Sequence, residues 1–188
     1  NAAAVVDWTR KAADAGARLV AFPEMTLTGY PIEDLALRAS FQRAADSAVR
    51  ALATELAETG LGDVTVVVGS VGTGSGSRPT NRAVVLRGGG VVAHYDKHHL
   101  PNYGVFDEAR IFVPGEEPAV VDVDGVRVGL AICEDIWREG GTVEQLAEHG
   151  VDLLLVINGS PYEEGKTHLR LESAAARVAR PASTPTRF

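Results

Sequence analysis

The sequence contains little cysteine and no long apolar run, and both shortages limit what the protein can be. Its 188 residues include one cysteine, Cys133, which excludes an internal disulfide framework and a zinc site built from cysteine pairs. No apolar stretch is long enough to span a membrane, and no basic and apolar leader opens the chain. These absences predict a cytoplasmic protein in a reducing compartment, with no membrane partner.

Positive charge is also scarce. The 18 Lys and Arg residues are outnumbered by 25 Asp and Glu residues, which gives a net charge of −7 at pH 7. Binding to nucleic acid needs a clustered basic surface, so the composition argues against a nucleic-acid partner. Hydrophobic residues make up 45% of the chain, which is enough for one domain to bury a core.

Helical and extended patterns alternate along the chain, which predicts an α/β protein. Apolar residues at helical spacing predict helices over residues 1–15, 40–58 and 142–149, and a last helix that ends near Arg180. Apolar runs predict strands over 17–22, from Val64 onward and over 151–158. Two hairpins are predicted, 83–87 with 91–95 around three glycines, and 119–123 with 126–132 around Asp124-Gly125. Apolar strands joined by helices, together with hairpins, predict mixed sheets covered on their faces.

A glycine- and serine-rich segment, 72–77, is predicted to form a mobile loop between two strands. Its GTGSG spacing is compatible with a phosphate-binding loop. However, Arg78 and Pro79 follow where a helix should open, and no Gly-Lys-Ser/Thr is present, so we predict no phosphate site.

Cys133 ends the apolar run VRVGLAIC and is followed at once by acidic residues. A strand end on a rigid scaffold can present a nucleophile to solvent, so this position favours a reactive thiol. A free cysteine is more often a small buried hydrophobe, and on Cys133 alone this alternative stays open.

Three segments, in order, resemble the nitrilase or carbon–nitrogen hydrolase superfamily and, within it, the glutaminase domain of glutamine-dependent NAD(+) synthetases. They are LVAFPEMTLTGYPIEDL (19–35), YDKHHLPNYGVFDEARIFVPG (95–115) and GLAICEDIW (129–137). The resemblance implies that Glu24, Lys97 and Cys133 are the catalytic residues. The chemistry agrees, because attack on an amide needs a thiolate, a base that forms it and a cation that holds the oxyanion. Taken alone, Glu24 is compatible with a turn carboxylate and Lys97 with a solvated charge.

The resemblance extends to the substrate. Tyr103, Ser160 and Lys166 match positions that bind glutamine in this family, and Glu134 matches part of the pocket wall. The stretch NYGVFDE differs from the general nitrilase pattern, which favours a glutaminase over a free-standing amidase. The alternatives are a packed tyrosine, a serine that caps a helix and a surface lysine.

The resemblance implies a nitrilase-like α-β-β-α sandwich with mixed sheets that self-associates into a homo-oligomer. Residues 1–188 would be a partial carbon–nitrogen hydrolase (glutaminase) domain, incomplete at both ends: the family begins with an additional strand, and Pro181 interrupts the last helix. The C-terminal synthetase domain, which would use ATP and Mg²⁺, is expected to be absent, and the glutaminase reaction itself needs no metal or cofactor.

The implied function is hydrolysis of glutamine through a cysteine thioester, which supplies ammonia to the chain's own or an associated synthetase domain for amidation of deamido-NAD(+). Two alternatives stay open: a stand-alone amidase of the same superfamily, and a non-catalytic truncated remnant. Asp96, His98 and His99 are compatible with metal ligands, and either histidine with the base of a Cys-His protease. Adjacent residues on an extended chain point to opposite faces, so we predict that the two histidines do not share a metal.

Overall fold

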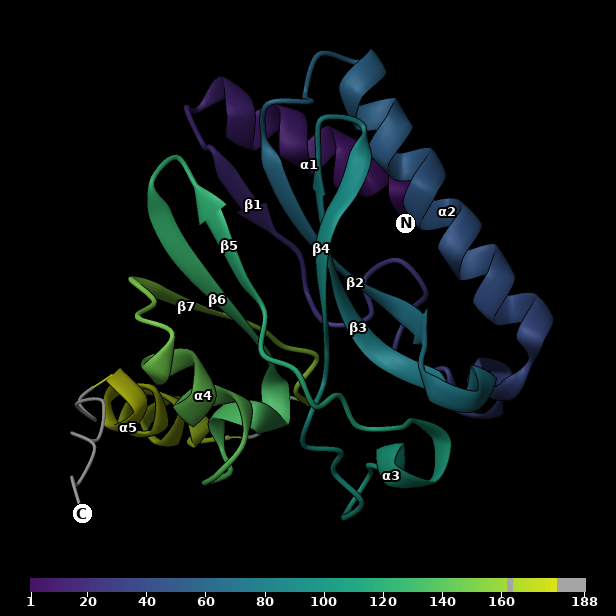
Figure 1. The fold of residues 1–188 in the computed structure, drawn as a ribbon. Coiled ribbons are helices and arrows are strands. Elements are labelled where there is room, and N and C mark those ends of the chain that lie inside the picture. Colours follow the sequence, from purple (N-terminus) through teal and green to yellow (C-terminus); the bar gives the residue numbers. More distant parts are fainter. Residues whose placement is uncertain (162–163, 179–188) are drawn as a thin grey trace.

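Two sheets face each other at the centre of the molecule (Figure 1). The computed structural model describes residues 1–161 and 164–178 of the chain. The first sheet has the order β1 (Leu19–Ala21), β2 (Thr65–Thr73), β3 (Pro79–Arg87) and β4 (Gly90–Asp96). The second has the order β5 (Val120–Val123), β6 (Val126–Ile132) and β7 (Leu153–Ile157). In each sheet one pair of strands is parallel and the rest are antiparallel, so the predicted mixed sheets are confirmed.

Helices cover the outer faces of the two sheets. On the first sheet lie α1 (Ala2–Asp14) and α2 (Ala39–Glu58), which run side by side in Figure 1. Beside the second sheet lie α4 (Thr142–Glu148) and α5 (Lys166–Val178). Short elements complete the described part: α3 (Glu108–Ile111) and the 3₁₀ turns η1 (Glu33–Leu37), η2 (Ser75–Ser77) and η3 (Cys133–Ile136). The layer order is that of an α-β-β-α sandwich, as the family resemblance implied.

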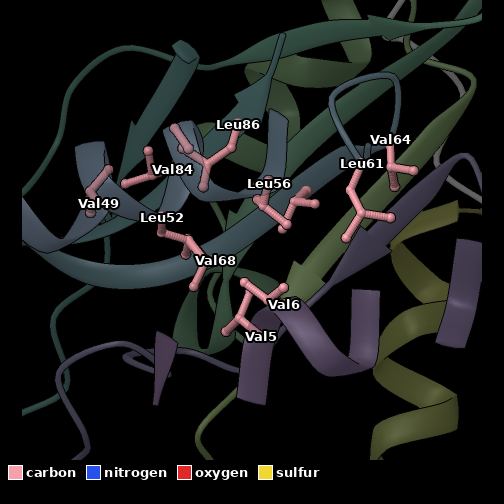
Figure 2. Close-up of a cluster of buried hydrophobic side chains, with 12 residues drawn as sticks. Val5, Val6, Val49, Leu52, Leu56, Leu61, Val64, Val68, Val84 and Leu86 are labelled. Carbon is pink, nitrogen blue, oxygen red and sulfur yellow. The ribbon is translucent and has the colours of Figure 1, made fainter. Parts of the chain in front are cut away.

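The alternation of side chains along β2 explains how one strand serves two apolar layers. Val66 and Val68 point to the helices and belong to the same apolar cluster as Leu52 and Leu56 of α2. Figure 2 shows Val68 together with these two leucines. Val67, between them, points to the second sheet and packs in the layer that joins the two sheets. A strand buried on both faces needs consecutive apolar residues, and Val66, Val67 and Val68 supply them.

The structure adjusts several predicted boundaries. Strand β2 continues to Thr73 and β3 begins at Pro79, so the connection between them is 74–78. The predicted loop 72–77 therefore begins two residues too early. The turn at Asp124-Gly125 is confirmed, and both residues have the positive φ angles, 53° and 88°, that a two-residue hairpin turn requires. The predicted helix end at Arg180 lies outside the described residues. Within the described part, no helix has the length and apolar character needed to cross a membrane.

Candidate active site

The predicted catalytic residues follow the ends of three different strands. Glu24 comes shortly after β1, Lys97 directly after β4, and Cys133 directly after β6. All three are buried, with exposed fractions of 4%, 0% and 6%. The first two belong to the first sheet and the third to the second, so the packing of the sheets against each other brings them together.

Lys97 lies between two carboxylates. Its Nζ atom is 2.8 Å from Oε1 of Glu24 and 2.8 Å from Oε2 of Glu108, a residue of α3. Burial acts to lower the pKa of Lys97, but the two carboxylates outweigh it and hold the pKa above its ordinary value. Burial also raises the pKa of Glu108, against the opposing effect of Lys97. The lysine is therefore a fixed cation in the interior of the protein.

Glu24 is held by hydrogen bonds from both sheets. Its Oε1 atom accepts a bond of 2.7 Å from Nδ2 of Asn81 on β3, in addition to the contact with Lys97. Its Oε2 atom accepts a bond of 2.8 Å from the backbone N–H of Gly159, which follows β7. These contacts fix the orientation of the carboxylate.

The loop that carries Glu24 crosses directly over β2. A Cβ atom placed on Gly69 would lie 2.2 Å from the backbone nitrogen of Met25 and 2.7 Å from the carbonyl oxygen of Pro23. Met25 itself has a φ of 56°, which is unfavourable for a residue with a side chain. Only glycine at position 69 lets the backbone of the loop approach this closely.

Cys133 stands at a sharp bend between β6 and η3. Its φ of 45° is a left-handed conformation, of the kind that proteins tend to retain at functional sites. Asp135 holds the bend: Oδ2 accepts bonds from the N–H of Ile132 and from the hydroxyl of Tyr95, and Oδ1 accepts one from the N–H of His99. Because Tyr95 and His99 belong to the β4 end of the first sheet, this carboxylate ties the cysteine turn to the lysine segment.

The thiol of Cys133 is protonated at neutral pH. Its Sγ atom is 3.3 Å from Oγ of Ser160, and the N–H of Gly159 also faces it. Burial and the charge of Glu24 raise its pKa to about 11, while Lys97 and the two hydrogen-bonding groups oppose the rise. A base must therefore remove the thiol proton before or during attack on a substrate.

The predicted substrate residues surround the same turn. Tyr103, about half exposed, donates a hydrogen bond of 2.8 Å to Oε2 of Glu134, which is buried beside Cys133. Arg138 donates one of 2.9 Å to the other oxygen of Glu134. Lys166 is the first residue of α5, but its side chain lies outside the described part. A pocket of about 650 Å³ between β7 and α5 adjoins Ser160.

The side chains of the two adjacent histidines are arranged differently from what the sequence predicts. His98 and His99 follow the end of β4, and their rings meet edge to face with centroids 4.6 Å apart, so the prediction that they point to opposite faces is wrong. Each ring also lies within hydrogen-bonding distance of a backbone carbonyl oxygen, His98 of Gly115 and His99 of Gly140. Among the described residues, no group of three His, Cys, Asp or Glu side chains could hold a metal ion.

Three residues of this site were not predicted from the sequence: Asn81, Glu108 and Asp135. Asn81 is fully buried and lies on the same face of β3 as Ala83 and Val85, so a polar residue in an apolar alternation was the available signal. Glu108 and Asp135 stand inside quoted motifs, but only the fold shows what they contact.

A model of the carbon–nitrogen hydrolase family matches residues 1–181. The chain therefore belongs to this family of hydrolases, and the resemblance found in the sequence is confirmed. It is 39% identical over 173 residues to the glutamine-dependent NAD(+) synthetase of Acinetobacter baylyi, which covers 92% of this chain and 31% of the relative. The corresponding protein of Thermotoga maritima is 42% identical over 172 residues, with 90% and 29% covered. The chain thus spans about a third of the length of these relatives.

Solved structures agree with the fold. A glutamine-dependent NAD(+) synthetase from Acinetobacter baumannii, in complex with ADP, superposes with a TM-score of 0.82 at 36% identity and covers 93% of this chain and 32% of its own. An amidase from Nesterenkonia sp. AN1 superposes with a TM-score of 0.75 at 26% identity, with 92% and 65% covered. That amidase carries acrylamide added to its active-site cysteine.

Proposed function

We propose that the chain is the glutaminase part of a glutamine-dependent NAD(+) synthetase and hydrolyses the side-chain amide of glutamine through a thioester on Cys133. The observation that carries this proposal is the buried contact of 2.8 Å between Glu24 and Lys97, next to a thiol at a strained strand end. A base, a cation and a nucleophile are the groups that amide hydrolysis requires. The relatives named above supply the choice of glutamine.

The first half of the reaction forms the thioester. Sγ of Cys133 attacks the amide carbon while Glu24 accepts the thiol proton, because the pKa of about 11 keeps this thiol protonated at rest. The negative charge moves to the amide oxygen, where Lys97 and the backbone N–H of Glu134 stabilise it. Glu24 then gives the proton to the leaving nitrogen, ammonia departs, and the acyl group remains on sulfur.

The second half releases the acid. Glu24 takes a proton from a water molecule that attacks the thioester carbon, and Lys97 again stabilises the oxyanion. Collapse of this intermediate breaks the carbon–sulfur bond and returns a proton to the thiolate, so glutamate leaves and the enzyme is regenerated. Glu108 and Asn81 touch Lys97 and Glu24 and keep both in place throughout the cycle.

The substrate residues would bind the remainder of glutamine: Tyr103 and Glu134, which are hydrogen-bonded to each other, Ser160, which lies next to the thiol, and Lys166, which the family resemblance implies. In a complete enzyme the ammonia would pass to a synthetase domain that uses ATP and Mg²⁺ to amidate deamido-NAD(+). The hydrolytic half needs no cofactor of its own. A cytoplasmic homo-oligomer fits this role.

A stand-alone amidase is the second candidate, because the Nesterenkonia amidase shares the fold over 92% of this chain. Substrate preference separates the two candidates. A glutaminase hydrolyses glutamine much faster than simple amides of the same length, whereas a general amidase does not require the amino-acid head group.

The proposal is tested by ammonia release and by mass spectrometry. We expect that a glutamine analogue with a diazoketone in place of the amide adds covalently to Cys133, and that Cys133→Ala abolishes both labelling and turnover. Lys97→Ala should lower kcat by about 10²–10³, as expected for the loss of an oxyanion donor. Arg50→Gln, a change on the exposed side of α2, serves as the matched control. Full turnover in Cys133→Ala would overturn the assignment.

A further inference from the structure

A buried carboxylate beside Lys97 is stabilised by a residue that has no part in the reaction described above. Glu108 of α3 is 3% exposed, and together with Glu24 and Lys97 it places two negative charges and one positive charge in the interior. Burial penalises the charged form of a carboxyl group, so a buried carboxylate with too few donors takes up a proton. The second carboxylate of this cluster therefore needs a further hydrogen-bond donor.

Tyr30 supplies that donor from a loop far away in the chain. Its hydroxyl donates to Oε1 of Glu108 over 2.9 Å, across 78 positions of the sequence. The same oxygen lies 3.1 Å from Nζ of Lys97 and 3.5 Å from Nδ2 of Asn81. The other oxygen, Oε2, faces Nζ of Lys97 at 2.8 Å and has no other partner among the described residues. Within the described part, Tyr30 thus gives Glu108 its shortest hydrogen bond from a neutral group.

The ring of Tyr30 is held by an apolar cluster beside the site. This cluster contains Ile111 and Phe112, and the ring packs against it. Because Ile111 belongs to α3, as Glu108 does, the cluster fixes the ring and the carboxylate relative to each other. Burial and the charge of Glu108 raise the pKa of Tyr30 well above its ordinary value, so the phenol keeps its proton and remains a donor.

The charges that face Glu108 act in opposite directions. Burial, as the largest effect, raises the pKa of its carboxyl above the ordinary value, and Glu24 adds to the rise. Lys97 and the hydrogen bond from Tyr30 oppose it. The other charged side chains on or next to α3 and η1 are exposed: Glu33, Asp34, Arg38, Asp107 and Arg110.

We propose that Tyr30 is a positioning residue for amide hydrolysis: its hydroxyl keeps Glu108 ionised, and the ionised carboxylate holds Lys97 in place. With both carboxylates charged, Nζ of the lysine lies between them, 2.8 Å from each. A protonated Glu108 would release the lysine on one side, and Lys97 would pair with Glu24 alone. Glu24 would then accept the thiol proton less readily, because the tighter ion pair favours its charged form. This inference rests on the proposed function, since it assumes that Glu24 and Lys97 carry out the reaction.

Carbon NMR of the chain with ¹³C-labelled glutamate measures the charge of Glu108 without any substrate. Its carboxyl resonance is the one that disappears in Glu108→Gln, and the pH dependence of that resonance gives a titration midpoint. Tyr30→Phe keeps the ring and removes the hydroxyl. The midpoint should then rise by about one pH unit, as expected for the loss of a hydrogen bond to a charged group. Thr28→Val, which removes a hydroxyl that contacts Met25 in the same loop, should leave the midpoint unchanged.

Glutamine turnover should follow the same titration. The acidic limb of kcat should move to higher pH in Tyr30→Phe by the same amount, which is about a ten-fold loss of kcat below the midpoint. KM should change little, since the hydroxyl contacts Glu108 and not the proposed substrate residues. In the Glu108→Gln background, Tyr30→Phe should cause no further shift. A merely structural role of the tyrosine would instead lower kcat at every pH in both backgrounds.

Two results would overturn the inference in a variant that thermal unfolding shows to be folded. One is a Glu108 midpoint that is the same in Tyr30→Phe and in the wild type. The other is a loss of kcat that does not depend on pH. A wild-type protein that does not hydrolyse glutamine would overturn the proposed function instead, and the carbon resonance would still show whether Tyr30 controls the charge of Glu108.

Discussion

At the scale of single residues, the site depends on charges that lie close together in a dry environment. Lys97 is fully buried and neutralises part of the charge of Glu24 and Glu108. Removing one member of a buried ion pair typically costs about 3–5 kcal/mol, because the partner keeps its desolvation penalty. The same charges act on the thiol of Cys133: Glu24 raises its pKa and Lys97 lowers it.

The opposite effects of Glu24 and Lys97 on the thiol pKa predict how alkylation of Cys133 depends on pH. Only the thiolate reacts, so the rate with iodoacetamide should rise with pH and level off above the pKa of about 11. Glu24→Gln removes a negative charge that raises this pKa, so the midpoint should move to lower pH. Lys97→Met removes a cation that lowers it, so the midpoint should move to higher pH.

Mass spectrometry of samples quenched between pH 6 and 12 measures these midpoints, with thermal unfolding as a check that each variant is folded. Since the sequence contains one cysteine, no second thiol complicates the profile. A midpoint that does not respond to either substitution would show that the charges of Glu24 and Lys97 do not reach the sulfur.

Individual residues differ in how far the sequence predicts their position. Glu24, Lys97 and Cys133 stand in motifs that the family resemblance identifies, and the fold brings them to one place. Glu108 and Asn81 could not be assigned in the same way, because their roles come from contacts with residues 11 to 78 positions away in the chain, such as Tyr30 and Glu24. Such contacts depend on tertiary structure that no local pattern encodes.

At the scale of elements, strand ends and the turns after them present the reactive groups. The cysteine turn is fixed by Asp135, and the Glu24 loop by its close passage over β2. Local signals predicted the strands and hairpins, because turn glycines and apolar alternation are local properties. The meeting of the His98 and His99 rings was not predictable in this way, since it follows from the end of β4 at Asp96.

The crossing over β2 gives a prediction with a matched control. In Gly69→Ala the new methyl group would collide with the backbone of Pro23 and Met25, so the loop that carries Glu24 must move. Gly90, in β4 of the same sheet, has open space around the position of a Cβ atom. We expect Gly69→Ala to lower kcat by about 10²-fold, since misplacement of a catalytic group by about 1 Å has this effect.

Gly90→Ala should retain wild-type turnover, and ammonia release under saturating substrate compares the two variants. Circular dichroism shows whether both remain folded. If Gly69→Ala keeps the full rate in a folded protein, the loop does not position Glu24 in the way proposed here.

At the scale of the whole molecule, the site is built across the contact between two sheets. Glu24 and Lys97 extend from the first sheet, and Cys133 and Ser160 from the second. The apolar layer between the sheets includes Leu130, whereas the layer between the first sheet and its helices includes Leu52 (Figure 2). The layer between the two sheets sets the distance between Cys133 and Glu24. The layer between the first sheet and its helices does not.

Two leucine substitutions separate these layers. Leu52 and Leu130 are each 1% exposed, so Leu52→Ala and Leu130→Ala should both lower the free energy of unfolding by about 2–5 kcal/mol. The effect on catalysis should differ, because relaxation around the cavity at Leu130 shifts β6 and the Cys133 turn relative to Lys97. We expect kcat at a temperature where both variants are folded to fall several-fold more in Leu130→Ala, and equal rates would mean that sheet packing does not tune the site.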